Sequence, residues 1–245
     1  MSMASSMFFL LDLLYAAGNR AALLTQAATR SNFVRTIEYV QRRSDMLGDL
    51  VIEHLWLVIV SVGIAVVVSV ILGVVISYKT SLASTVLAIC QILMTIPSMA
   101  MLGFMVPLFG IGFTTGVVAL ILYALLPVVR NTYTGIKEIS PAVVESAVGM
   151  GMTEWRVLTK IKIPLARPVI MAGIRTATVM VVGIAAIAAY VGAGGLGELI
   201  FQGISRSNEP MIIVGAIGVS IIALVFDFVL SWGERRLAAI GKGGN

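Results

Sequence analysis

The stretch that decides the fold runs from His54 to Tyr78 and reads HLWLVIVSVGIAVVVSVILGVVISY, with no Asp, Glu, Lys or Arg. It is longer than the roughly 20 apolar residues that a helix needs to cross a bilayer. It also lacks the strict alternation of polar and apolar residues that a strand of a membrane barrel requires. The stretch therefore predicts a membrane-spanning α-helix.

Further spans follow from the positions of the charged residues. Residues 80–129 contain none. This run is long enough for two spans joined by a turn at residues 109–112, where glycines supply turn geometry at little cost. Residues 168–192 and 211–232 each suit one more span and hold one ionised side chain apiece. The chain is therefore predicted to be an all-α membrane protein with five core spanning helices.

The composition supports a membrane protein and excludes several functions. Hydrophobic residues make up 59% of the 245 residues and charged residues only 12%, whereas a soluble domain carries about a quarter charged residues. The mean hydropathy is +1.02. Too few charges remain to cover a water-facing surface, which excludes a soluble enzyme, a nucleic-acid-binding domain and a disordered regulator. The single cysteine, Cys90, cannot form an internal disulfide.

Basic residues indicate which ends of the spans face the cytoplasm, because cytoplasmic loops are enriched in Lys and Arg. With five spans, the loop 193–210 lies on the side with few basic residues and is expected outside. The opposite side is predicted to be cytoplasmic because three basic regions fall there, namely Lys79, the loop 131–167, and the C-terminal Arg235, Arg236 and Lys242.

The N-terminal residues fit this orientation poorly, because they carry five arginines and would lie outside. A sixth spanning helix near residues 3–25 would resolve the conflict, although Asp12 and Arg20 fall inside it. The alternative, which we favour, is an amphipathic helix over residues 33–50 that lies in the membrane interface. The predicted organisation is an extension at 1–50, a transmembrane domain at 51–236 and a cytoplasmic tail at 237–245.

The loop 131–167 is the only long polar segment between the spans, and its capping residues predict two short helices. An N-cap precedes each helix, a left-handed glycine ends the first, and a proline ends the second. The first helix is expected to start at Ser140 and Pro141 and to end at Gly149 or Gly151. The second is expected to start at Thr153 and to end at Pro164, and the fourth span is expected to start at Pro168.

This loop contains a spaced motif. Its sequence is Glu145-Ser-Ala-Val-Gly-Met-Gly151, then nine residues, then Ile161-Lys-Ile-Pro164. It resembles the cytoplasmic signature of ABC importer permeases, which is Glu-Ala-Ala, three residues, Gly, nine residues and Ile-x-Leu-Pro. The spacing matches throughout, and two positions depart conservatively: Ser146 stands for Ala and Ile163 for Leu.

The resemblance extends to the permeases for glycine betaine, carnitine, choline and related osmoprotectants. It implies a bundle of the type I ABC importer permeases in a bacterial inner membrane, moving such a compound inward by alternating access. The implied partners are two ATP-binding subunits, a second permease chain, identical or homologous, and a substrate-binding protein. Four further segments carry this resemblance, at 91–98, 126–137, 171–177 and 191–197.

In such permeases the loop is a coupling helix that docks on the ATPase subunit. A small apolar face formed by Ala147, Val148 and Met152 is expected to pack there, and Glu145 offers a charge to a fixed partner. The alternative is an ordinary solvated helix–turn–helix between two spans. The resemblance assigns the coupling role to Glu145, Ser146, Ala147, Gly151, Ile161, Ile163 and Pro164.

The sequence gives no sign of catalysis in this chain. It has no Gly-x-x-x-x-Gly-Lys-Ser/Thr stretch to hold nucleotide phosphates, so ATP hydrolysis is expected on a separate chain. No cluster of His, Cys or carboxylates has metal-ligand spacing, so neither a metal nor a cofactor is expected. The alternative transport function is an ion-coupled secondary carrier, which would need inverted repeats and polar groups near the bilayer midplane.

Arg175 and Asp227 are the ionised groups well inside spans, where charges are costly and are usually paired or functional. At roughly 1.5 Å per residue, Arg175 lies about 12 Å beyond Arg167 and Asp227 about 10 Å before Glu234. Both offsets start from the predicted cytoplasmic face, so the two residues lie at similar depth. We predict an ion pair; a role in the gate or translocation path and snorkelling to the interface are the alternatives.

Glycines and prolines mark the remaining irregular points. The run Val191–Gly197 follows a predicted span and suits a flexible outer loop that contacts a substrate-delivering receptor, or a simple turn. Pro97 and Pro107 in the second span and Pro127 in the third are expected to bend their helices.

Overall fold

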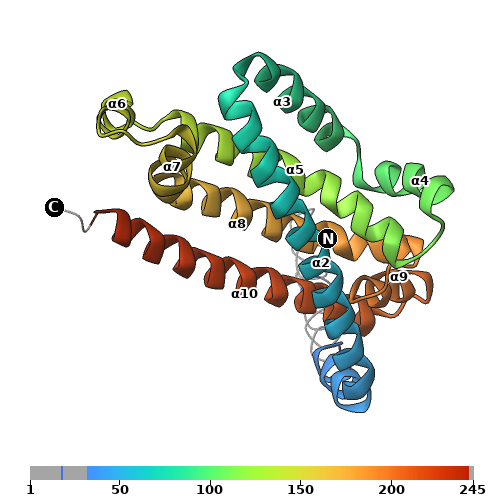
Figure 1. The fold of residues 1–245 in the computed structure, drawn as a ribbon. Helices are drawn as coiled ribbons and strands as arrows, with labels where there is room; N and C mark the ends of the chain where they lie inside the picture. The colour runs from blue at the N-terminus through green and yellow to red at the C-terminus, as the bar shows by residue number, and fades with distance from the viewer. Residues whose placement is uncertain (1–17, 19–31, 243–245) are drawn as a thin grey trace, which may run out of the picture.

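The computed structural model describes residue 18 and residues 32–242, with side chains placed up to residue 236. Within this part of the chain, the structure contains helices and no strand. Figure 1 shows α6, α7 and the end of α10 at one end of the bundle and α9 at the other. The predicted all-α architecture is confirmed, whereas the alternative sixth span near residues 3–25 falls almost entirely outside the described residues.

A short N-terminal helix at residues 32–42 leads through a turn at Arg43 into the bundle. The helices that follow are α2 (Ser44–Tyr78), α3 (Thr80–Thr95), α4 (Ser98–Phe109), α5 (Phe113–Lys137), α6 (Pro141–Gly149), α7 (Glu154–Val157), the π-helix η1 (Leu158–Lys162), α8 (Ile163–Ala188), the 3-10 helix η2 (Ala189–Val191), α9 (Gly197–Ser205) and α10 (Glu209–Lys242).

The described residues contain four helical segments long and apolar enough to cross a membrane, and a bent helix pair that makes a fifth if it is one span. The four are α2, α5, the continuous stretch Glu154–Val191 and residues Glu209–Arg236. The bent pair is α3 with α4. This number agrees with the five spans predicted from the stretches without charged residues. The protein is therefore a multi-pass membrane protein.

The second span is broken at Pro97, one of the two prolines expected to bend it. Its two halves meet at 100°, because Ile96 and Pro97 adopt extended backbone and α4 starts anew at Ser98. A proline disfavours helical backbone in the residue before it, and it lacks the N–H that would continue the hydrogen bonds of the helix. The Tyr123 hydroxyl of α5 donates a hydrogen bond to the Ile96 carbonyl, so the break leaves this group satisfied.

The turn between the second and third spans lies at the predicted position. Gly110 and Gly112 have φ of +79° and +128°, a region that side chains other than glycine rarely enter. The Gly112 N–H donates to the Val191 carbonyl over 2.8 Å. The turn before α5 is therefore fastened to the end of the fourth span.

Helices α2, α5 and α8 form the centre of the bundle, and α10 packs along α8 (Figure 1). Leu57, Leu120 and Val181 are fully buried among them. Glycines bring these helices close together: a Cβ on Gly173 of α8 would lie 2.8 Å from the Pro127 carbonyl oxygen of α5. Such small-residue contacts drive helix association in lipid, where the hydrophobic effect between helices is weak.

Replacing Gly173 by alanine should destabilise the bundle, because the added Cβ would also lie 2.6 Å from the Asn131 Cβ. Overpacking of this kind costs about 1–3 kcal/mol, which should lower the thermal midpoint in detergent by several degrees. Gly183→Ala on the same helix is the matched control, because nothing lies within 4 Å of its added Cβ. Equal midpoints for the two variants would contradict the close α5–α8 contact.

Candidate functional site

The first helix of the loop that was predicted to be cytoplasmic, α6, ends in a tight backbone turn. Gly151 has φ of +79°, so Gly151 rather than Gly149 is the left-handed glycine. The Met152 N–H donates to the Ala147 carbonyl over 3.1 Å, and the Gly151 N–H donates to the Val148 carbonyl over 2.9 Å. Together these bonds satisfy carbonyls at the helix end. Pro141 opens the helix as predicted, but the Ser140 side chain makes no capping hydrogen bond.

The exposed face of this loop agrees only in part with the predicted one. Ala147 is buried, so it is not available to a partner, and Met152 is only partly exposed. Val148 is exposed as predicted, at 55%, and the other large apolar side chains that face outward are Val143, Met150 and Trp155, the last two at 76% and 72% exposure. The exposure of Met150 and Trp155 could have been predicted, because they are large apolar residues in an otherwise polar segment.

The remaining predicted coupling residues divide between exposed and packed positions. Glu145 and Ser146 are exposed on α6, and the Ser146 hydroxyl donates to the Ala142 carbonyl of its own helix. Ile161, Ile163 and Pro164 are half-buried. Their neighbour Lys162 lies 4.7 Å above the centre of the Tyr78 ring, which docks this part of the loop on the end of α2.

The second helix of the loop does not end where expected. Thr153 caps its start by accepting from the Arg156 N–H, as predicted. Pro164 was expected to end it, but the helix continues from Glu154 to Val191 without a break. The π-helix η1 explains this, because the Ile163 N–H donates to Leu158, five residues back, and the wider turn accommodates the proline ring. Pro168 likewise lies inside α8 rather than at its start.

Arg175 and Asp227 contact each other across α8 and α10. Arg175 Nε lies 2.6 Å from Asp227 Oδ1, and Arg175 Nη2 lies 3.0 Å from Asp227 Oδ2, a bidentate arrangement. Glu234 was not predicted to join this pair, and it adds a contact of 3.4 Å to Arg175 Nη1. Its spacing of two helical turns from Asp227 could have revealed it. The three side chains form a charge triad that is 29–39% exposed on this chain.

The charge triad borders a cavity of about 420 Å³, lined also by Ala172, Thr176, Val179 and Met180. The ionised groups therefore lie on one open face of α8 and α10 and not in the packed centre of the chain. Among the described residues, no group of three or more His, Cys, Asp or Glu side chains could hold a metal ion.

Arg175→Met and Asp227→Leu should each lower the thermal midpoint in detergent, and the double variant should lose less than the two single losses combined. Arg175→Met should cost more, because it leaves Asp227 and Glu234 without a cation, whereas Asp227→Leu leaves Arg175 its contact with Glu234. Strictly additive losses, or a larger loss from Asp227→Leu, would contradict this arrangement.

At the opposite end of the bundle, the Gly-rich run Val191–Gly197 is packed closely onto α2. A Cβ on Gly195 would lie 2.9–3.0 Å from atoms of His54, and the Gly195 N–H donates to Glu53 Oε2 over 3.1 Å. His54 is fully buried, with Nε2 3.2 Å from the Val182 carbonyl oxygen. It was expected at the outer start of the first span, but α2 begins ten residues earlier, at Ser44.

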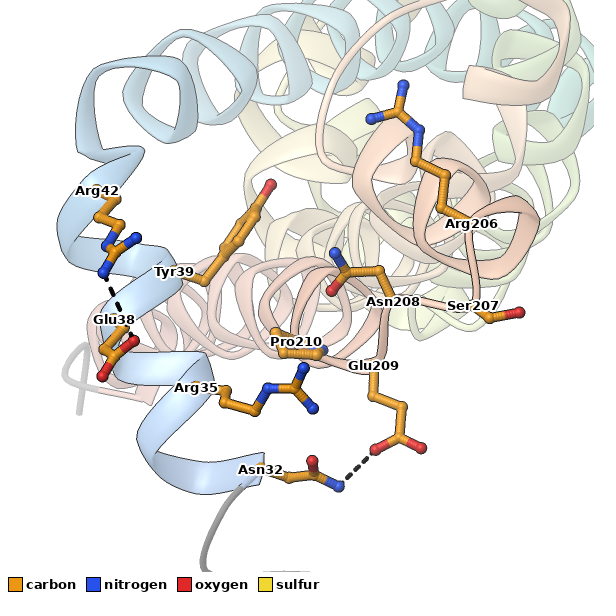
Figure 2. Close-up of a pocket in the computed structure, with 10 residues that line it drawn as sticks. All are labelled: Asn32, Arg35, Glu38, Tyr39, Arg42, Arg206, Ser207, Asn208, Glu209 and Pro210. Atoms are coloured by element: carbon orange, nitrogen blue, oxygen red, sulfur yellow. Dashed lines mark hydrogen bonds and ion pairs between the residues drawn. The ribbon is translucent and has the colours of Figure 1, made fainter.

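A polar cavity of about 470 Å³ opens at the same end, between the N-terminal helix and the turn from α9 to α10 (Figure 2). Its lining includes three arginines and two glutamates. Figure 2 shows Arg35 directed toward Glu209 and Pro210, while Asn32 donates to the Glu209 carboxylate. Arg42 is 3.9 Å from Glu38 on its own helix.

Comparison with known proteins adds to this geometry. The family model described as "Binding-protein-dependent transport system inner membrane component" matches residues 36–239. The osmoprotectant import permease protein OsmW of Salmonella typhimurium (strain LT2) is 46% identical over 200 residues, which cover 80% of this chain and 93% of that protein. The glycine betaine/carnitine/choline transport system permease protein OpuCB of Bacillus subtilis (strain 168) is 42% identical over 192 residues, or 78% and 88% of the two chains.

The fold is shared with solved transporters. A chain of the MetNI methionine ABC transporter, in an inward-facing conformation, superposes with a TM-score of 0.73 at 24% sequence identity. The match covers 80% of this chain and 98% of that one. The predicted permease bundle is confirmed by this shared fold.

Proposed function

The chain belongs to the family of binding-protein-dependent transport system inner membrane components, and we propose that it is the membrane-spanning subunit of an ATP-driven importer. Its substrate is a small osmoprotectant of the glycine betaine, carnitine or choline type, moved inward by alternating access. The substrate class follows from the names of the relatives that are 42–46% identical to this chain.

The observation that carries the proposal is the geometry of the cytoplasmic loop. Val148, Met150 and Trp155 are exposed on a loop whose turn at Gly151 is held by the hydrogen bonds from the Gly151 and Met152 N–H groups. Exposed apolar side chains on a rigid turn suit a fixed partner surface. We assign that surface to the ATP-binding subunits, with Glu145 at its edge and the residues Ser146 to Pro164 shaping and supporting it.

The loop has a direct connection to the transmembrane core. Because the helix runs unbroken from Glu154 to Val191, a displacement of the loop by the ATPase would pass into α8 without an intervening flexible joint. Helix α8 packs against α2, α5 and α10 and carries Arg175. The charge triad is thus positioned to respond to movement of the loop.

The remaining partners are assigned by position. Two ATP-binding subunits meet the loops of two permease chains, the second being identical or homologous. A substrate-binding protein docks at the opposite end, where the polar cavity of Figure 2 and the Gly-rich run lie. The open cavity beside the charge triad provides a face for the second permease chain or for the translocation path between the two.

The alternative of an ion-coupled carrier has less support. A carrier needs a carboxylate that can bind and release its coupling ion within the membrane. Asp227 is instead held by two hydrogen bonds from Arg175. The family match also favours the ATP-driven importer.

Gly151→Ala should reduce coupling between the ATPase and this chain. Alanine in the left-handed region is strained by about 1 kcal/mol or more, which would alter the exposed turn. Gly149→Ala is the matched control, because Gly149 is helical and, as at Gly151, nothing lies within 4 Å of an added Cβ. The measurements are co-purification of the ATP-binding subunit and substrate uptake in proteoliposomes.

A second variant, Glu145→Lys, reverses an exposed charge on the contact surface without altering the glycine turn. It should weaken subunit association or uncouple ATP hydrolysis from uptake. Wild-type association and uptake in both Gly151→Ala and Glu145→Lys would rule out the loop as the ATPase contact.

The purified chain alone should hydrolyse no ATP, because its sequence contains no phosphate-binding loop of the ATPase type. Adding the cognate ATP-binding subunit should restore turnover, and the substrate-loaded binding protein should stimulate it. Sustained nucleotide turnover by the chain alone, after removal of contaminating ATPases, would contradict this assignment.

A further inference from the structure

A second cavity at the predicted outer end combines aromatic rings with carboxylates. It has a volume of about 310 Å³ and lies where α2, the start of α5, the Gly-rich run and α9 meet. Small-molecule sites begin at roughly this size, so the space suits one small ligand or part of one. The lining consists of Glu53, Trp56, Phe113, Glu198 and the glycine-rich backbone at residues 192–194.

The two aromatic side chains keep much of their surface uncovered. Trp56 is 60% exposed on α2, and Phe113, the first residue of α5, is 38% exposed. An aromatic belt at the membrane–water interface would explain Trp56 alone. It would not explain why ring and carboxylate groups from separate parts of the chain line one cavity.

The backbone stabilises the charge of the two carboxylates in different ways. Glu53 Oε2 accepts the Gly195 N–H over 3.1 Å. Glu198 lies in the first turn of α9, where the helix dipole stabilises negative charge. No Lys or Arg lines this cavity, and no ion pair is formed by either carboxylate within the described part of the chain.

From this arrangement we infer that the cavity binds the quaternary ammonium group of the transported compound as it enters the permease. A quaternary ammonium group has no N–H to donate, so hydrogen-bond acceptors alone cannot recognise it specifically. Aromatic ring faces attract such a cation, and nearby carboxylates compensate its charge. Trp56 and Phe113 supply the rings, Glu53 and Glu198 supply the charge, and the substrate class rests on the proposed function.

The site is tested by binding of choline to the purified full-length chain in detergent, measured by isothermal titration calorimetry. The neutral analogue 3,3-dimethylbutan-1-ol has nearly the same shape and lacks the charge. The wild-type chain should bind choline saturably and more tightly than the alcohol. Trp56→Leu should weaken choline binding about fivefold or more, as expected for loss of a cation–π contact.

The variants are chosen to separate recognition from folding. Trp56→Phe keeps a ring and should retain most of the binding, and Glu53→Gln keeps an acceptor for the Gly195 N–H while removing charge. Phe104→Leu is the control for Phe113→Leu, because Phe104 is an exposed aromatic residue of α4 that does not line the cavity. Equal affinity for choline and the alcohol, absence of saturable binding, or unchanged binding in Trp56→Leu would overturn the site.

Uptake by the assembled importer separates this inference from the proposed function. Uptake of choline, glycine betaine or carnitine that is unaffected in Trp56→Leu and Phe113→Leu would overturn the site and leave the proposed function intact. Failure of the wild-type assembly to import any of the three would overturn the proposed substrate class. The comparison of choline with the neutral alcohol on the chain alone would still show whether the cavity binds a quaternary ammonium group.

Discussion

Every backbone carbonyl that leaves a helix within a membrane must find a donor inside the protein, because lipid offers none. Two irregular points in the described part of the chain illustrate that constraint. The break at Ile96 and Pro97 is closed by the Tyr123 hydroxyl. The turn at Gly110–Gly112 is closed by Thr115, which donates to the Gly110 carbonyl, and by the contact of Gly112 with Val191. Each local departure from a helix thus also fastens two elements together.

Charged side chains in the bundle are likewise satisfied by partners within the protein. Arg175, Asp227 and Glu234 are brought together on α8 and α10, so that no member of the charge triad faces lipid without a counterion. At the other end, the carboxylate of Glu53 fixes the Gly-rich run that follows the fourth span. The charge triad lies near the middle of the helix that runs from Glu154 to Val191, and the Glu53 contact lies just beyond its Val191 end. A displacement of that helix would therefore be expected to move both the triad and the Gly-rich run.

Much of the fold follows from where charged residues are missing, because a span tolerates few of them. The gaps predicted the number of spans, the turn at residues 109–112 and, through the rise of a helix, the similar depth of Arg175 and Asp227. The sequence could not show that Pro164 would be accommodated, because that depends on the π-helix η1 just before it. It also suggested a bend at Pro97 but not a turn of 100°, which depends on packing against α5. The burial of Ala147 and the position of Trp56 and Phe113 on one cavity likewise depend on tertiary packing.

The unbroken helix from Glu154 to Val191 has 38 residues, which makes a rod about 57 Å long at roughly 1.5 Å per residue. Because the rod is long, a small tilt at one end moves the other end by a larger distance. If the rod tilts about its inner end by roughly 5°, its outer end is displaced by about 5 Å. That outer end holds the Gly112 N–H through the Val191 carbonyl, and Phe113 is the next residue. A sub-ångström adjustment near the proposed ATPase contact would thereby be magnified into a displacement of several ångströms at the wall of the cavity that Phe113 lines.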